Sequence, residues 1–155
     1  MTLEDKINVI YNWVIAQQGV QQIDIFGSIE SVEEPTYEEI AEDILAKLGI
    51  SRGISGFRYI AWAVGLVAKD ENNLRNITVT LYANGGEHFH TSASAFERGV
   101  RHAIDSTLRN SKNPTPEAIR IFGGDRNIAD YSNKAVIATL AAEVKKCKRL
   151  HKFDI

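Results

Sequence analysis

The sequence predicts an all-α domain, a bundle of about six helices with a short helical extension at its N-terminus. Two observations favour this fold class. Apolar residues recur at intervals of three and four positions over several long segments, which is the spacing of one face of an α-helix. Capping residues or Pro stand where several of these segments begin, and Gly where several of them end, as expected of helix termini.

Residues 1–35 are expected to form an extension to the main domain, which spans residues 36–155. Apolar residues line one side of Leu3–Gln18 and predict an amphipathic helix that ends at Gly19. Residues Ile23–Phe26 alternate as in a short strand or an extended segment, and Glu33–Pro35 resembles a linker. The extension is expected to cap the main domain, to pair two copies of the chain or to dock on another regulator.

Two helices are predicted between Thr36 and Lys69. The first runs to Lys47, with Thr36 as its cap, acidic residues in its first turn and Gly49 beyond its end. After a turn at Gly53–Gly56, the segment Phe57–Lys69 is apolar on nearly all sides, so this helix is expected at the centre of the bundle.

The segment from Asn76 to Leu108 predicts two further helices. The first begins within Asn76–Ala83 and is expected to be short or broken, since Gly85 and Gly86 each cost a helix about 1 kcal/mol relative to alanine. The second begins between Thr91 and Ser94, with Ser94 and Glu97 as a capping box. Its apolar stripe consists of Phe96, Val100, Ala103, Ile104 and Leu108.

The opposite face of this second helix is polar, with hydroxyls at its start and arginines one turn later. Such a pattern suits a helix whose N-terminal end enters the DNA major groove, although solvated helices also have polar outer faces. A polar loop over Leu108–Pro116, a short helix from Thr115 to Phe122, a loop over Asp125–Asp130 and a terminal helix from Asn133 to about His151 complete the prediction.

The charge of the chain is unevenly distributed, although its formal net value is only −2. Twelve Lys and Arg stand against eight Asp and Glu from Ile77 onward, and six against twelve before it. This asymmetry fits a basic DNA-binding surface on an acidic support. No apolar run approaches the roughly 20 residues of a membrane span, and the acidic N-terminus is unlike a signal peptide. A cytoplasmic protein with no membrane partner is expected.

No catalytic, cofactor or metal site is predicted. The single cysteine, Cys147, excludes a disulfide framework and a thiolate zinc cluster. His88 and His90 lack an obvious third ligand. Ser92, His102 and Asp105 share one helix, which does not provide the geometry of a catalytic triad. An enzyme is therefore not expected.

The run Thr91–Asp105 resembles the recognition helix of the effector domain of the sporulation stage-zero regulator A family, which reads roughly T-[ST]-A-S-R-V-E-R-A-I-R-H-A-I-E. Similar matches occur at Ile44–Ile50, Ile54–Ile60, Ile77–Tyr82, Ile121–Gly123 and Ser132–Ile137. The resemblance implies a helix-turn-helix that contacts double-stranded DNA with helix 92–108. It also implies that residues 1–35 replace the receiver domain of the family. They are too few to form one, so phosphorylation of an aspartate is not the expected switch.

The resemblance assigns the DNA contacts. The positions of Ala95, Glu97 and Arg98 approach bases, with Arg98 suited to guanine and Glu97 to cytosine. Arg101 and His102 lie further along, toward the backbone. Phosphate contacts are expected from Thr91, Ser92, Ser94, Arg109 and Lys112.

Two departures from the family pattern qualify the DNA contacts. Ala95 replaces an arginine, a loss of about 1–3 kcal/mol of base discrimination, and Ala83–Gly86 replaces P-D-I-A. We expect a sequence-specific DNA-binding transcription regulator. The alternative is an interaction or dimerisation protein that does not bind DNA and modulates another regulator through its N-terminal or C-terminal helix.

Overall fold

The computed structural model describes residues 33–123 and 130–153, and the regular secondary structure of these ranges is entirely helical, as predicted. The chain divides between Glu34 and Pro35 into two units, and the helices described below belong to the second. The predicted helix Leu3–Gln18 and segment Ile23–Phe26 lie outside the described residues, as does most of the predicted loop 125–130. None of the described helices has the length and apolarity required to cross a lipid bilayer.

Helix α2 (Tyr37–Lys47) begins where the sequence predicts. The Glu39 backbone N–H donates to the Thr36 hydroxyl at 3.1 Å, and the Thr36 N–H donates to the Glu39 carboxylate at 2.9 Å. These two bonds form a capping box, which satisfies backbone donors that the first turn of a helix leaves unpaired. Gly49 follows the helix with a φ of +95°, a conformation that favours glycine.

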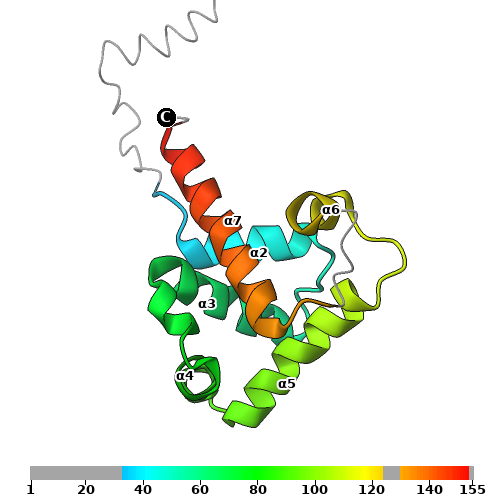
Figure 1. The fold of residues 1–155 in the computed structure, drawn as a ribbon. Helices are drawn as coiled ribbons and strands as arrows, with labels where there is room; N and C mark the ends of the chain where they lie inside the picture. Colours follow the sequence, from blue (N-terminus) through cyan, green and yellow to red (C-terminus); the bar gives the residue numbers. More distant parts are fainter. Residues whose placement is uncertain (1–32, 124–129, 154–155) are drawn as a thin grey trace, which may run out of the picture. The chain divides into compact units, whose positions relative to one another are not determined.

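Helix α3 (Ser55–Lys69) is the centre of the bundle and packs against α2, α5 and α7. It starts earlier than predicted, because Ser55 and Gly56 already belong to the helix and the preceding turn ends at Ile54. Figure 1 shows α7 (Asn133–Phe153) running across α2 and α3, with α4 (Ala83–His88) and α5 (Ala93–Ile104) meeting at the opposite end of the bundle. The core lies where these helices meet, and its largest fully buried side chains are Phe57, Phe96, Leu45, Leu48, Ile60, Leu81, Ile104, Ile137 and Leu140.

The helix that begins with α5 ends one residue after the predicted end at Leu108. A π-helical turn, Asp105–Arg109, continues α5, and Leu108 is buried in it as the last residue of the predicted apolar stripe. Helix α6 (Pro116–Phe122) then begins as predicted, with the Ala118 N–H donating to the Thr115 hydroxyl and Pro116 in the first turn. Arg120 donates to Glu117 on the same helix and to Glu143 on α7, which fixes α6 against the terminal helix.

Helices α3 and α5 cross at a pair of glycines. A Cβ atom on Gly56 would lie 2.4 Å from the carbonyl oxygen of Gly99, and one on Gly99 would lie 2.8 Å from the ring of Tyr59. Real Cβ atoms do not approach other atoms so closely, so the backbones of the two helices can come this near only because Gly56 and Gly99 carry no side chain.

Gly56→Ala is expected to lower the free energy of unfolding by about 1–3 kcal/mol, because the added methyl group forces α3 and α5 apart. Gly53→Ala is the matched control, since its Cβ would meet only the Ser51 hydroxyl at 3.5 Å, and a change within about 0.5 kcal/mol is expected there. Urea unfolding followed by circular dichroism measures both. Equal stability of the two variants would contradict the close crossing.

Candidate nucleic-acid interface

The first helix of the helix-turn-helix is continuous. A π-helical turn, Thr78–Tyr82, leads directly into α4, so the helix is not broken at its glycines. Its α-helical part, Ala83–His88, is short, which is the other outcome that the sequence predicts. The prediction of a short or broken helix rests on Gly85 and Gly86, and tertiary contacts explain why glycine stands at both positions. A Cβ on Gly85 would lie 2.5 Å from the ring of Phe96, and one on Gly86 would lie 2.8 Å from the Thr91 carbonyl oxygen. The glycines therefore lower helix propensity but allow α4 to approach α5.

The turn between the two helices is tight. The Thr91 N–H donates to the Gly86 carbonyl at 2.7 Å, and His90 has a φ of +59°, in the left-handed region. Behind the turn, the ring of Phe89 lies 4.9 Å from that of Tyr59, which in turn stacks on Phe96 at 4.7 Å. This aromatic cluster joins the turn to α3 and holds the start of α5 in place.

Ser92, and not Ser94, caps α5. The Ala95 N–H donates to the Ser92 hydroxyl at 3.0 Å, which places the N-cap two residues before the predicted one. Glu97 does not complete a capping box, because its carboxylate pairs with Arg101. The helix still begins within the predicted interval, and the hydroxyl of Ser94 is left on the exposed surface.

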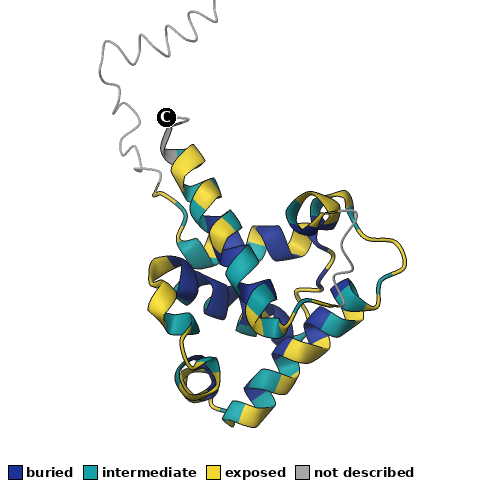
Figure 2. Ribbon diagram, viewed as in Figure 1, coloured by how far each residue is buried: buried dark blue, intermediate teal, exposed yellow. Residues whose placement is uncertain are grey.

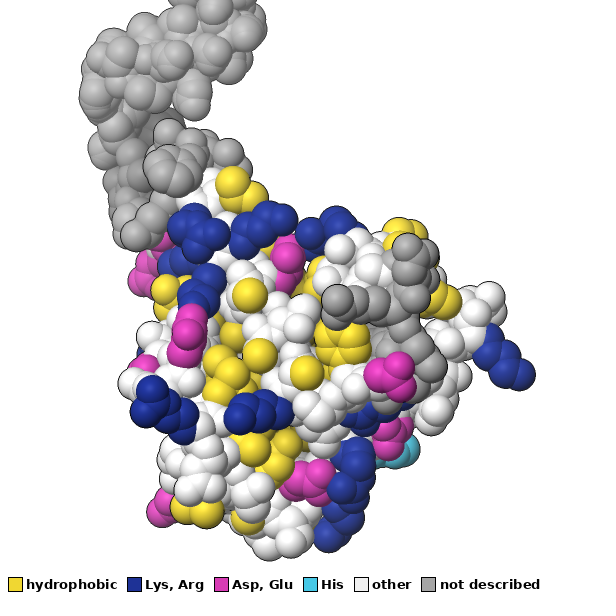
Figure 3. Space-filling model, viewed as in Figure 1, with side chains coloured by type: hydrophobic (Ala, Val, Ile, Leu, Met, Phe, Trp, Pro, Cys, Tyr) yellow, Lys and Arg dark blue, Asp and Glu magenta, His cyan; other side chains and the backbone are white. Residues whose placement is uncertain are grey.

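Buried residues alternate with exposed and half-buried ones along α5 (Figure 2), because its inner face is fully buried. The exposed residues of its outer face are polar. Arg98 lies on this outer face, is exposed, and makes no ion pair or hydrogen bond to another residue in the described part of the chain. Figure 3 shows that basic and acidic side chains are interspersed along α5, whereas Lys and Arg gather over the C-terminal half of α7. The remaining predicted contact residues of the outer face are Ser94 and His102, which are exposed, and Ala95, which is half-buried.

Glu97 and Arg101 form an ion pair one helical turn apart. The Arg101 guanidinium donates to both carboxylate oxygens of Glu97, at 2.9 and 2.8 Å. Asn133, at the start of α7, also donates to this carboxylate, at 3.4 Å. The sequence suggested that the Glu97 carboxylate is a free acceptor for cytosine. In the structure this carboxylate accepts hydrogen bonds from Arg101 and Asn133.

Arg109 is bound within the domain. Its side chain is only 14% exposed and donates to the Asp105 carboxylate, the Tyr131 carbonyl oxygen and the Asn133 side chain. The bonds to Tyr131 and Asn133 connect the end of the α5 helix to the start of α7, and the phosphate contact of Arg109 stays a prediction. Lys112, in the following loop, is exposed.

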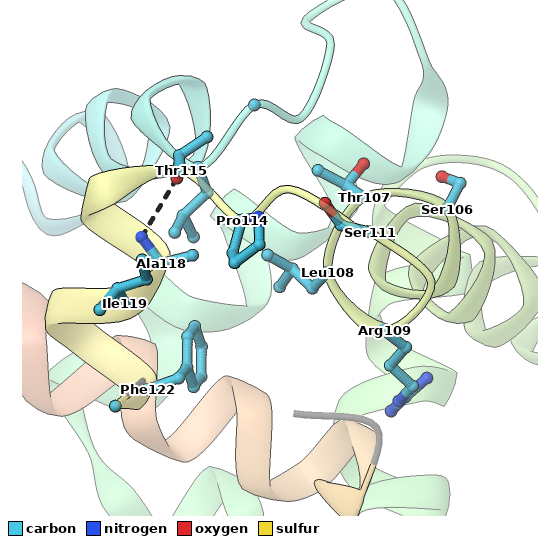
Figure 4. Close-up of a pocket in the computed structure, with 13 residues that line it drawn as sticks. Ser106, Thr107, Leu108, Arg109, Ser111, Pro114, Thr115, Ala118, Ile119 and Phe122 are labelled. Atoms are coloured by element: carbon cyan, nitrogen blue, oxygen red, sulfur yellow. Dashed lines mark hydrogen bonds between the residues drawn. The ribbon is translucent and has the colours of Figure 1, made fainter. Parts of the chain in front are cut away.

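A cavity of about 480 Å³ lies between the end of α2, the π-helical turn after α5 and helix α6. Its lining combines apolar side chains such as Leu108 and Phe122 with the hydroxyls of Ser106, Thr107 and Ser111. Figure 4 shows the guanidinium of Arg109 pointing away from these hydroxyls, so Arg109 lines the cavity without placing its charge in it. In the described ranges, no three His, Cys, Asp or Glu side chains group as metal ligands would.

Two helices joined by a tight turn, the second capped at its start, buried on one face and polar on the other, define a helix-turn-helix domain of the class found in DNA-binding proteins. Residues 41–144 match the family described as sporulation initiation factor Spo0A C terminal, and the chain belongs to this family. The family is one of DNA-binding effector domains and not a family of enzymes. The resemblance of the recognition helix is thereby confirmed.

Ser92→Ala is expected to lower the free energy of unfolding by about 1 kcal/mol, because the first turn of α5 loses its side-chain acceptor. Ser94→Ala, two residues away and exposed, is expected to change it by less than about 0.5 kcal/mol. Thermal and urea unfolding of the two variants test the assignment of the cap. If Ser94→Ala lowers the free energy of unfolding more than Ser92→Ala does, Ser94 is the cap, as the sequence suggested.

Proposed function

We propose that this protein is a transcription regulator that binds specific sequences of double-stranded DNA, with the exposed face of α5 in the major groove. Membership of a DNA-binding effector family supports this function. The observation that carries it is Arg98, an exposed guanidinium without a protein partner in the described residues, four residues after the exposed Ser94. A guanidinium so placed suits the O6 and N7 acceptors of guanine.

The residues around Arg98 have different proposed roles. Thr91, Ser92 and Ser94 lie at the N-terminus of α5, where hydroxyls and free backbone N–H groups suit a phosphate. Ala95 offers a contact to a thymine methyl group in place of the arginine of the family. The preferred DNA sequence is therefore expected to differ from that of a member with arginine at this position.

We further propose that residues 1–35 cap the effector domain or pair two copies of it. Regulation by this segment, which is shorter than a receiver domain, is proposed not to involve phosphorylation of an aspartate within it. Deletion of residues 1–34 distinguishes the two: tighter DNA binding indicates a cap, whereas conversion of a dimer to a monomer indicates a pairing segment.

The experiment that tests the proposed function is selection from a random-sequence DNA pool by the full chain, at low and at physiological salt. Specific recognition predicts an enriched motif that persists at physiological salt. Binding that enriches no motif and disappears as salt rises reflects phosphate attraction alone. That outcome would favour the alternative function, an interaction protein that retains the fold but does not recognise DNA sequences.

Arg98→Ala is expected to weaken binding to the enriched site by about 1–3 kcal/mol and to remove the preference at one base pair. Arg149→Ala on α7, also exposed, removes the same charge away from α5 and is expected to leave the motif unchanged. Fluorescence anisotropy with the enriched site and with single-base variants of it measures both effects. An unchanged preference in Arg98→Ala would rule out its contact with a base.

A further inference from the structure

The start of α7 is connected to the DNA-binding face through one side chain, Asn133. Its amide nitrogen donates to the Glu97 carboxylate at 3.4 Å, and its amide oxygen accepts from the Arg109 guanidinium. The Tyr82 hydroxyl, which is buried, shares a further hydrogen bond with the Asn133 side chain. One amide thus contacts the first helix of the helix-turn-helix, the recognition helix and the π-helical turn that follows it.

The contacts of Asn133 continue to the surface of α5. Glu97, which Asn133 holds from the inside, receives the Arg101 guanidinium from the outside. The side chain of Glu97 is 25% exposed and that of Arg101 is 48% exposed. The order of contacts is therefore a half-buried amide, a partly exposed carboxylate and an exposed guanidinium.

We propose that Asn133 is a positioning residue for DNA recognition, which orients Arg101 through Glu97 and so makes Arg101 a second determinant of sequence specificity beside Arg98, in contrast to the backbone position that the family resemblance implies for Arg101. This inference rests on the proposed function. It assigns Glu97 to the support of Arg101 and not to a cytosine. A guanidinium held by a fixed carboxylate populates fewer conformations than a free one. It therefore loses less conformational entropy when it binds a base.

The side-chain geometry explains why asparagine suits this position. The amide supplies a donor to the carboxylate and an acceptor to the guanidinium at the same time, from two atoms of one group. Aspartate would keep the acceptor for Arg109 but would place a second carboxylate against Glu97. Alanine would remove all three contacts and leave the Glu97 carboxylate, the Arg109 guanidinium and the Tyr82 hydroxyl without this partner.

The test compares Asn133→Ala and Asn133→Asp with the unaltered full chain, by selection from the random-sequence pool and anisotropy on single-base variants of the enriched site. Both variants are expected to lose preference, by about fivefold or more, at a base pair that Arg101→Ala also affects and that Arg98→Ala does not. Affinity of Asn133→Ala for a shuffled sequence is expected to remain within about twofold, because this substitution changes no charge. Asn133→Asp keeps the bond to Arg109 and therefore tests the inference even if Asn133→Ala fails to fold.

Ser132→Ala is the matched control. It removes the hydroxyl that accepts from the Ala135 N–H at the start of α7, next to Asn133 but without a contact to Glu97. It is expected to change thermal stability but not base preference. Unchanged preference in both Asn133 variants, or an equal loss in Ser132→Ala, would overturn the inference. If the unaltered protein enriches no motif, the proposed function itself fails, which is a distinct result.

Discussion

The close contact between α3 and α5 at Gly56 and Gly99 is the constraint on which the rest of the structure depends. Because the helices approach at backbone distance, the apolar face of α5 is buried completely and its register on the bundle is fixed. Gly85 likewise allows the backbone of α4 to lie against the ring of Phe96, because it carries no side chain. The orientation of the polar face therefore follows from packing at positions that carry no side chain.

Both ends of the recognition helix are held in addition to its centre. At the start, the Ser92 cap and the bond from Thr91 to Gly86 define the turn. At the end, Arg109 connects the π-helical turn to the residues that begin α7. A helix fixed at three points presents its outer side chains with little freedom, which is the condition for recognition by geometry and not by charge alone.

Most of the positive charge along α5 and the π-helical turn that follows it is paired with acidic side chains. Glu97 pairs with Arg101, and Asp105 pairs with Arg109, so two of the three arginines from Arg98 to Arg109 have an acidic partner. For a chain with a formal net charge of −2, non-specific attraction to phosphates is expected to be modest. The proposed sequence recognition would then depend on how well a few side chains are placed, which gives helix packing and capping a role in the proposed function.

The sequence by itself determined the helical fold class, the Thr36 cap of α2, the start of α6 at Pro116 and the apolar face of α5. Each depends on residues close together in the chain, through helix periodicity or capping chemistry. Only the tertiary structure decided that Gly85 and Gly86 support a continuous helix, that Arg109 faces inward and that Glu97 meets Asn133, 36 positions away. These outcomes depend on contacts between distant residues, where the free energy of packing outweighs local propensity.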